Sequence, residues 1–380
     1  MQCLDGSRGE LNVYKRLPVT LVRGEGVYVY DDQGKRYLDL YGGHAVATLG
    51  YGPTAVTEAI SEQARQLFFQ TNAVELRNRQ LATESLLNCV SGTYTGAFLC
   101  NTGAEANENA LRLALFGTSR SKVAAMKGAF HGRSAAAGAV TEGNDSWYAF
   151  PRSPFEVVWL DPEDLKSLEK LDDPEIGAVI FEPVQGVAGA IDLPIKWLDE
   201  LQKFCRRHGI VTIADEVQCG VLRTGPFLAS SSLEREPDLV TLAKGLGSGF
   251  PVGAVLVTES IARRVSPGFL GTTFGGGPLA CAAIEATLTE VGRRGLEEHV
   301  GKISSWLKNE LGELGLALQG RGLLIGIKFS KSVHTLRHQL LEFGYLCGDA
   351  KDPNVLRLTP PLIITKDDLA PFIETLGEII

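Results

Sequence analysis

The sequence lacks any apolar run long enough to cross a membrane. Across 380 residues, no run reaches the roughly 18–20 apolar residues that a spanning helix needs. The longest uncharged stretch near that length, residues 245–258, is interrupted by glycines and a proline. Residues 1–10 include Asp5, Arg8 and Glu10 and have no apolar core, which predicts no secretory signal. We therefore expect a cytoplasmic protein with no membrane partner.

An excess of positive charge is also missing. The chain has 37 basic and 45 acidic residues, a net charge of −8. Proteins that bind nucleic acid or anionic membranes usually carry a basic patch or a basic balance. The charge therefore argues against a nucleic-acid partner and favours small-molecule ligands.

No two cysteines stand in a C-x-x-C spacing. The seven cysteines are Cys3, Cys89, Cys100, Cys205, Cys219, Cys281 and Cys347. An odd number of scattered cysteines indicates neither a zinc site nor a disulfide framework. We expect reduced thiols, as in a cytosolic protein, and no metal site.

Glycine, in contrast, is abundant, and it gathers after apolar runs. The 43 glycines exceed the average share of about 7%. Short apolar runs predict buried strands at residues 97–100, 123–126, 157–160, 178–181, 210–214 and 239–243. Stretches with helical character, such as residues 105–116 and 194–208, separate most of them. This alternation predicts an α/β fold with a mostly parallel sheet covered by helices.

Three regions of the chain are expected. Residues 1–45 form an N-terminal segment whose pattern at 27–40 predicts a β-hairpin, which we expect to pack on the small domain. Residues 46–280 form the large domain, with an amphipathic helix at 53–67. Residues 281–380 form a smaller α/β domain with helices near 296–314 and 333–343, strands at 323–329 and 355–358, and a last helix that begins at the N-cap Thr365.

Ligands of such sheets lie beyond the carboxyl ends of the strands, so the residues that follow each run matter most. Asp215 ends one run, where it is either a helix cap or the partner of a cationic group on a ligand. Lys244 ends the next run and is the only charged residue in 239–258. Surroundings this apolar should lower the pKa of its ammonium and free the amine for attack on a carbonyl, although a lysine that reaches the surface is the more common case.

A glycine turn at residues 101–104 leads directly into a helix. The free N–H groups at a helix N-terminus suit a phosphate, although a plain helix cap is an equally good interpretation of this turn alone. A reactive lysine, a carboxylate for a pyridinium nitrogen and a phosphate cradle are together what pyridoxal phosphate requires of a protein. Their joint occurrence at the strand ends of one sheet predicts this cofactor.

The motifs themselves resemble those of class III aminotransferases of fold type I. They are NTGAEAN at 101–107, GAFHGR at 128–133, FEPVQG at 181–186, ADEVQCG at 214–220, AKGLGSGFP at 243–251 and GTTFGG at 271–276. The resemblance runs in order from about residue 20 to the C-terminus. Within the family, the compact length, Gly132-Arg133 and the segment 321–326 are most similar to acetylornithine aminotransferases.

This resemblance implies roles for individual residues. Lys244 would bind the cofactor covalently and move the proton, and Asp215 would hold the protonated ring nitrogen. The further cofactor-binding residues would be Thr102, Gly103, Ala104, Phe130, Val217, Gln218 and Thr273. Gln218 would bond the phenolic oxygen, Phe130 would stack on the ring, and Thr273 would reach the phosphate bound by the partner subunit. The last role implies a homodimer with shared active sites.

The resemblance also implies four substrate-binding residues, Arg133, Thr272, Arg357 and Glu182. Arg133 would bind the α-carboxylate of the amino acid, because a guanidinium binds a carboxylate through two parallel hydrogen bonds. Arg357 would bind a carboxylate of 2-oxoglutarate, with a surface arginine on an edge strand as the alternative. Thr272 would lie beside the substrate.

The sequence departs from the family at two places. Relatives of the ornithine and acetylornithine type have a glutamate after the E-P-x-Q-G motif, where it pairs with the second arginine; here the position is Val187. Arg357 is then expected to lack that partner and to favour donors with an acidic arm. His44, in the stretch 42–45, either faces the substrate or is structural.

The function implied is transfer of the terminal amine of an N-acylated ornithine, acetyl- or succinylornithine, to 2-oxoglutarate. The products would be the acyl-glutamate semialdehyde and glutamate, as in arginine biosynthesis. Aminotransferases for ornithine, 4-aminobutyrate or a carrier-linked lysine precursor are alternatives within the fold. A pyridoxal-phosphate aminomutase or decarboxylase is another, because the same cofactor groups serve these reactions.

Overall fold

The structure is a computed structural model that describes residues 10–380. Residues 1–9 lie outside the described residues. They include Cys3 and nearly all of the segment 1–10, for which the sequence predicts no secretory signal. The large sheet of the molecule has seven strands in the order β4-β12-β11-β10-β7-β5-β6. Its strands are β4 (Tyr94–Cys100), β12 (Gly253–Thr258), β11 (Leu239–Leu242), β10 (Val211–Asp215), β7 (Ile176–Phe181), β5 (Lys122–Met126) and β6 (Glu156–Leu160).

The sheet is mostly parallel, as the alternating pattern predicted. β11, β10, β7, β5 and β6 run parallel, and all six predicted runs are strands of this sheet. β12 is the exception, since it pairs antiparallel with both β4 and β11. The sequence analysis does not predict β12, because the glycines and proline before it resemble a continuing loop.

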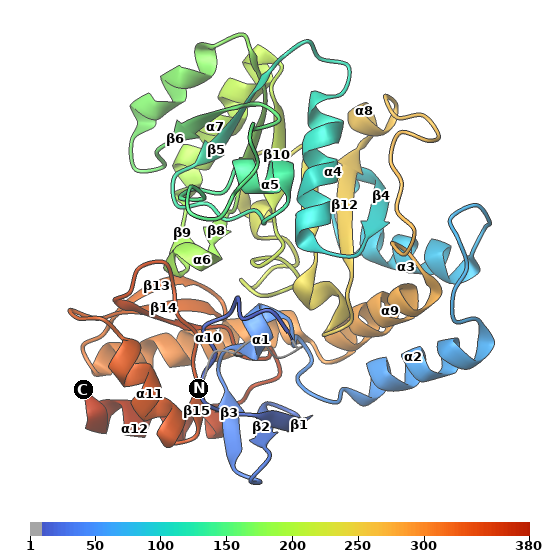
Figure 1. The fold of residues 1–380 in the computed structure, drawn as a ribbon. Helices are drawn as coiled ribbons and strands as arrows, with labels where there is room; N and C mark the ends of the chain where they lie inside the picture. Colours follow the sequence, from blue (N-terminus) through green and yellow to red (C-terminus); the bar gives the residue numbers. More distant parts are fainter. Residues whose placement is uncertain (1–9) are drawn as a thin grey trace.

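Alternating side chains of the strands bury both faces of this sheet. On one face, Val123 and Ala125 belong to the core cluster that includes Leu111 of α4 (Gly103–Leu115). On the other, Ala124 and Met126 share a cluster with the inner side of α7 (Ile195–His208). That second cluster also contains residues of α3 (Arg77–Asn88) and α9 (Pro278–Arg293). The helices therefore cover both faces, which leaves the carboxyl ends of the parallel strands for a ligand (Figure 1).

The C-terminal part contains a three-stranded antiparallel sheet, β13 (Ala317–Arg321), β14 (Leu324–Lys328) and β16 (Val355–Leu358). Its helices are α10 (Leu296–Glu313), α11 (His334–Glu342) and α12 (Lys366–Ile379). The helices and strands predicted here are all present. Thr365 caps α12 through a capping box with Asp368, as its sequence position indicated.

The predicted hairpin is part of a separate sheet that joins both ends of the chain. β1 (Leu21–Glu25), β2 (Tyr28–Asp31) and β3 (Arg36–Asp39) are antiparallel, and β3 pairs in parallel with β15 (Tyr345–Leu346) (Figure 1). α1 (Gly42–Ala45) and α2 (Thr54–Gln66) follow. α1 is a single left-handed turn, since the φ angles of its four residues lie between 55° and 67°. The pairing of β3 with β15 brings residues near 41 and 357 into one neighbourhood.

Within the described part of the chain, no helix combines the length and the apolar composition that crossing a bilayer requires.

Candidate active site

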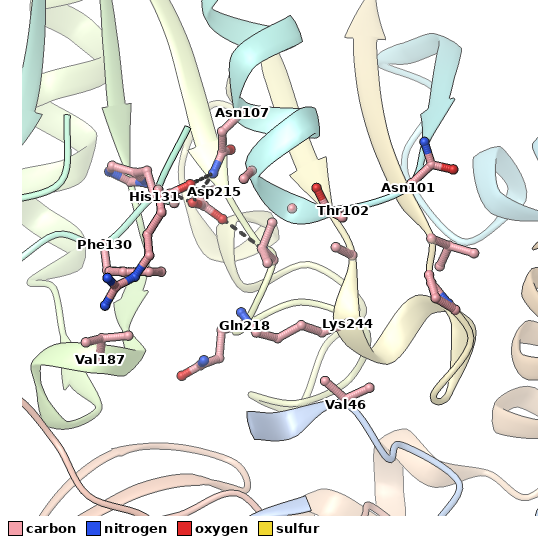
Figure 2. A pocket seen from close by; sticks show the side chains of 18 of the residues that line it. Val46, Asn101, Thr102, Asn107, Phe130, His131, Val187, Asp215, Gln218 and Lys244 are labelled. Atoms are coloured by element: carbon pink, nitrogen blue, oxygen red, sulfur yellow. Dashed lines mark hydrogen bonds and ion pairs between the residues drawn. The ribbon is translucent and has the colours of Figure 1, made fainter. Parts of the chain in front are cut away.

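A cavity of about 480 Å³ lies beyond the carboxyl ends of the parallel strands. Most of the residues predicted for the site line it. They are Thr102, Gly103, Ala104, Phe130, Arg133, Glu182, Asp215, Val217, Gln218 and Lys244. Thr272, Thr273 and Arg357 are not among its lining residues. Because residues from six separate segments meet here, the sheet and not any single motif assembles the cavity (Figure 2).

The register of two strands brings the predicted lysine to the predicted carboxylate. Asp215, the last residue of β10, is paired with Thr241 of β11, and Lys244 follows three positions later. Lys244 begins a short 3₁₀ helix, Lys244–Gly247, and its φ of 40° lies in the left-handed region that non-glycine residues rarely adopt. Strain of this kind, of order 1–3 kcal/mol per residue, collects at functional sites.

The surroundings of Lys244 favour the neutral amine. The side chain is partly exposed to the cavity but enclosed by protein, and this burial is the main cause that lowers the pKa of its ammonium. The positive charge of Arg357 acts in the same direction, while Asp215 and Glu182 oppose it. A lysine with a lowered pKa keeps a fraction of free amine, which is the form that attacks a carbonyl.

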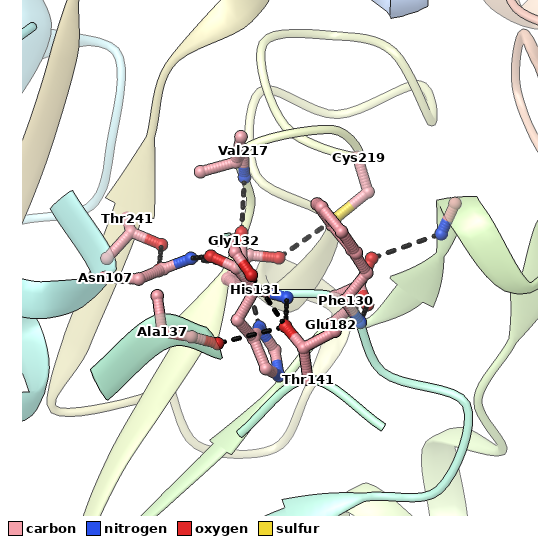
Figure 3. Close-up of polar contacts among 12 residues, drawn as sticks. Asn107, Phe130, His131, Gly132, Ala137, Thr141, Glu182, Val217, Cys219 and Thr241 are labelled. Carbon is pink, nitrogen blue, oxygen red and sulfur yellow. Dashed lines mark hydrogen bonds and ion pairs between the residues drawn. The ribbon is translucent and has the colours of Figure 1, made fainter. Parts of the chain in front are cut away.

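Asp215 is held by donors on both of its carboxylate oxygens. Oδ1 accepts from Val217 N at 3.0 Å, and Oδ2 accepts from Asn107 Nδ2 at 2.7 Å. Oδ2 also lies 2.8 Å from Nδ1 of His131, which is 2% exposed (Figure 3). Val217, Asn107 and His131 therefore fix the carboxylate of Asp215 in a site where this residue is only 3% exposed. A helix cap does not explain this environment.

His131 and Asn107 line the cavity and contact Asp215, although the sequence motifs assigned no role to either. Asn107 also donates to the backbone oxygen of His131 at 2.7 Å, and its own Oδ1 accepts from Thr241 at 2.7 Å. The motifs that contain both residues were recognised, but no role was given to either. The available signal was position: Asn107 lies four residues after Gly103, which is one helical turn and hence the same face of α4.

The N-terminus of α4 supplies the predicted anion cradle. Thr102 is its N-cap and accepts from Glu105 N at 3.1 Å, which leaves the amides of Gly103 and Ala104 at the cavity without intrahelical acceptors. A Cβ on Gly103 would lie 2.6 Å from a methyl carbon of Val217, so only glycine fits here. The 13-residue helix adds the positive end of its dipole.

Glu182 supports the backbone on the opposite side. Its Oε1 accepts from Phe130 N at 2.9 Å and its Oε2 from Gly186 N at 3.2 Å. Burial, with a further contribution from the negative charge of Asp215, raises the pKa of this carboxyl to about 7, against a smaller opposing effect of His131. Glu182 lines the cavity, but the contacts that it makes within the protein hold the loop that carries Phe130.

The two arginines predicted to bind carboxylates differ sharply. Arg133 lines the cavity, is exposed, and lies over the ring of Trp147 at 4.7 Å. Arg357 is 4% exposed and donates from Nη1 to Gly186 O at 2.8 Å and to Gln218 Oε1 at 3.1 Å. Its Nη2 donates to the Tyr41 hydroxyl at 2.7 Å. Arg357 is therefore not a surface arginine, and among residues 10–380 no carboxylate pairs with it.

Val187 and His44 are the two departures from the family pattern. Val187 lies in the short turn α6 (Gly186–Gly189) and lines the cavity. His44 lies in the left-handed turn α1; its side chain is exposed and its ring centroid is 4.5 Å from that of Tyr41. It is not one of the cavity-lining residues.

Thr272 and Thr273 lie beside the cavity and not in its wall. The Thr272 hydroxyl accepts from Asn101 Nδ2 at 3.1 Å and from Gly275 N at 3.3 Å. Thr273 is exposed, and the next residue, Phe274, packs its ring 5.4 Å from that of Phe69. The threonines thus belong to an outward-facing surface next to the site.

Taken together, the cavity holds an amine with a lowered pKa, a fixed carboxylate and an anion cradle. These are the groups that pyridoxal phosphate needs, so the residues present fit this cofactor chemically. Among the described residues, no group of three or more metal-ligating side chains has the geometry to hold a metal ion.

Comparison with known proteins points to one family. A family model for class III aminotransferases matches residues 11–380. The chain is 38% identical to the acetylornithine aminotransferase of Methanopyrus kandleri, over 94% of this chain and 93% of that protein. The structure of ornithine aminotransferase from Toxoplasma gondii superposes with a TM-score of 0.91 at 28% identity, covering 97% of this chain and 91% of that one. The structure of acetylornithine aminotransferase from Elizabethkingia anophelis has a TM-score of 0.85 at 29% identity, with coverages of 97% and 95%.

Proposed function

The chain belongs to the class III aminotransferases, and on that premise we propose that it uses pyridoxal phosphate to move the terminal amino group of an N-acylated ornithine to 2-oxoglutarate. The observation that carries this proposal is the meeting of Lys244, Asp215 and the N-terminus of α4 around one cavity. The products are the acyl-glutamate semialdehyde and glutamate.

Each of these groups performs one task for the cofactor. When bound, pyridoxal phosphate supplies an aldehyde carbon that takes up the amine and a protonated ring that withdraws electrons from the reacting carbon. The amides of Gly103 and Ala104 would hold its phosphate, and Phe130, which also lines the cavity, would contact its ring. Asp215 would hold the protonated ring nitrogen, and Val217, Asn107 and His131 fix the position of its carboxylate.

Lys244 has two tasks in this proposal. Its amine, whose pKa burial lowers, would be the group that holds the cofactor covalently. As a base in the lining of the same cavity, Lys244 would also move the proton that the reaction requires. Arg133, which lines the cavity with an exposed guanidinium, binds a substrate carboxylate.

The acylated donor is supported by the relatives of this chain. Eight curated relatives at 34–38% identity all have the name acetylornithine aminotransferase. The apolar side chains of Val46, Val187 and Phe250 in the cavity wall provide contact surface for a neutral acyl arm. Free ornithine would instead bring an additional ammonium group to these residues.

Ornithine is nevertheless a second candidate donor, because solved structures of ornithine aminotransferases share this fold at 28% identity and a TM-score of 0.91. A panel of acetylornithine, succinylornithine, ornithine and 4-aminobutyrate, each with 2-oxoglutarate, tests the proposal through glutamate formation. We expect the highest kcat/KM with an acylated ornithine. Absence of transfer from every donor would refute the proposed reaction.

A homodimer with shared sites completes the proposal. Thr273 faces outward beside the cavity, next to Phe274, which is 66% exposed. Phe68 and Phe69, at 67% and 40% exposed, lie on the same side of the chain through the contact between Phe69 and Phe274. Aromatic side chains this exposed mark an interaction surface, and a second copy there would bring its Thr273 towards this phosphate site.

The cytosol is the expected compartment for this enzyme. The six described cysteines are all free, and five of them are buried. Reduced cysteines are the rule in that compartment.

A further inference from the structure

The side-chain amide of Gln218 contacts protein groups through its oxygen and lines the cavity. Its Oε1 accepts from Arg357 Nη1 at 3.1 Å. The amide also approaches Gly186 closely, since a Cβ there would be 1.7 Å from Oε1 and 2.4 Å from Cδ. Gln218 lines the cavity, and among residues 10–380 no oxygen accepts from its Nε2.

The chemistry of arginine fixes which end of the amide faces the ligand. A guanidinium only donates hydrogen bonds, whereas a glutamine amide can donate through nitrogen or accept through oxygen. A flipped amide would press its NH₂ group against the NH₂ group of Arg357, which is unfavourable. Arg357 therefore selects the orientation in which Oε1 faces the arginine and Nε2 is left for the cavity.

Arg357 is in turn held in place by neutral acceptors. Gly186 O and the Tyr41 hydroxyl accept from its two terminal nitrogens at 2.8 and 2.7 Å. Tyr41 is itself anchored, since its N–H donates to Asp39 Oδ1 at 2.7 Å and its carbonyl accepts from Thr359 Oγ1 at 2.7 Å. The guanidinium therefore has little freedom to turn away from Gln218.

Val187 offers no acceptor that could compete with Gln218 for the guanidinium of Arg357. Val187 directly follows Gly186, whose carbonyl bonds Arg357. A carboxylate at that position would offer the guanidinium a charged acceptor, and charge-assisted hydrogen bonds are roughly twice as strong as those to a neutral amide. With valine there, Gln218 meets no such competitor.

We propose that Arg357 is a positioning residue that fixes Gln218 as a hydrogen-bond donor toward an anionic oxygen of the cofactor. The proposal rests on the proposed function for the identity of the cofactor, and the oxygen concerned is the phenolic one. Arg357 acts through Gln218, so it affects cofactor affinity whether or not it also meets a substrate carboxylate.

A double-mutant cycle on cofactor binding tests this. The dissociation constant of pyridoxal 5′-phosphate is measured for the cofactor-free full chain and for Arg357→Met, Gln218→Leu and the double variant. Loss of one charge-assisted hydrogen bond should weaken binding about tenfold in each single variant. The double variant should be no weaker than either single one, because both remove the same contact. Arg357→Lys, which restores a donor, should recover part of the affinity.

Two controls separate positioning from general damage. Arg223 is another buried arginine, 2% exposed, which donates to the carbonyls of Leu323 and Pro360. Arg223→Met should lower thermal stability without changing the dissociation constant of the cofactor. Gln218→Glu keeps a partner for Arg357 but removes the donor, and should bind the cofactor as weakly as Gln218→Leu.

Three results would overturn the proposal. They are a multiplicative, roughly hundredfold loss in the double variant, an equal loss in Arg223→Met, and an unchanged cofactor affinity in Arg357→Met. In the last case, a KM for 2-oxoglutarate raised more than tenfold would make Arg357 a carboxylate-binding residue instead. The proposed function fails separately, if no donor of the panel transfers its amine to 2-oxoglutarate in the wild type.

Discussion

The two walls of the cavity are built on different principles. The sheet wall consists of Asp215, Asn107 and His131, which line the cavity, with Thr241 behind them, and all four are at most 3% exposed. These residues sit on β10, on α4, on the loop after β5 and on β11, which are adjoining elements of the seven-stranded sheet and its covering. Each group has a partner of opposite hydrogen-bonding character at 2.7–2.8 Å.

The arginine wall consists of Arg357 with Tyr41, Gly186 and Gln218, of which only Gln218 lines the cavity and the others lie behind it. It is assembled from segments far apart in the sequence. Arg357 meets Tyr41 across 316 positions, Gly186 across 171 and Gln218 across 139. No partner of Arg357 carries a formal charge, and its Nε has no hydrogen-bond partner among the described residues. Here a buried cation is stabilised by neutral groups alone.

The difference teaches where chemistry and selectivity reside. The sheet wall fixes a lysine and a carboxylate with little freedom, as a reaction common to the family requires. Single substitutions can change the hydrogen bonds of the arginine wall, because all of them are made by the one side chain of Arg357. We therefore expect substitutions in the sheet wall to abolish the reaction and substitutions in the arginine wall to change affinity or preference.

The largest effect is expected for Lys244→Ala. Since no other amine would occupy its place in the cavity, turnover should fall below detection while the protein stays folded. Treatment of the wild type with borohydride should fix the cofactor on Lys244, as read by peptide mapping. Lys203→Ala, a change of an exposed lysine paired with Glu200 and Glu234, is the control and should be fully active. Finding the cofactor on a different lysine would overturn the assignment.

Asp215→Asn should come next, with a loss of several orders of magnitude in kcat. An amide cannot keep the ring nitrogen of the cofactor protonated, although covalent attachment at Lys244 should persist. Asp238→Asn is the matched control, because Asp238 precedes β11 at the opposite end of the sheet and accepts from Thr212 N at 2.9 Å. That variant should keep its activity. Near wild-type rates for Asp215→Asn would reduce Asp215 to a structural role.

The same contrast explains how much the sequence could predict. Asp215 and Lys244 were predicted because each directly follows an apolar run, and parallel strands bring such ends together. Apolar runs predicted six of the seven strands of the sheet, and helical spacing of apolar residues predicted the helices α4, α7 and α10 to α12. β12 was not predicted, because its apolar run follows glycines and a proline that resemble a continuing loop.

The arginine wall could not be predicted from local patterns. Nothing in the sequence near Arg357 indicates that Tyr41 will bond it, since that contact depends on the pairing of β3 with β15. The motif comparison did place Arg357 at the site and did identify Val187 as a departure. The motifs could not predict that neutral groups would bond Arg357 in place of a carboxylate. Those groups belong to Tyr41, Gly186 and Gln218, which lie in three other segments of the chain.

Glu182, at the junction of the two walls, should produce a pH dependence of stability. Its pKa is raised from an ordinary 4.5 to about 7 by burial. Between these values the folded state binds the extra proton, so the free energy of unfolding should fall as the pH rises from 4.5 to 7, by at most about 3 kcal/mol. Urea unfolding of the cofactor-free protein across this range measures it.

Glu182→Gln should flatten that slope, because it removes the titrating group. The exposed Glu163→Gln serves as the control and should retain the wild-type slope. A wild type whose stability is constant or increases over this range would show that Glu182 ionises normally in the folded protein.

The smallest effect, and the one that tests the arginine wall most directly, is expected for Val187→Glu. It places a carboxylate in the cavity wall next to Gly186, within the neighbourhood of Arg357. The wild type, with an uncompensated guanidinium behind this wall, should prefer succinylornithine and acetylornithine to cationic ornithine. Adding a negative charge should shift kcat/KM toward ornithine and away from succinylornithine by about ten- to a hundredfold, as expected for a charge-assisted contact worth about 1.5–3 kcal/mol.

Val187→Gln separates charge from size in this test. It has nearly the same shape as the glutamate variant but no charge, so it should leave the order of the three donors unchanged. If the glutamate also draws Arg357 away from Gln218, Val187→Glu alone should weaken cofactor binding, whereas Val187→Gln should not. A wild type that already prefers free ornithine, or a glutamine variant that shifts preference as far as the glutamate one, would show that the charge behind this wall does not select the donor.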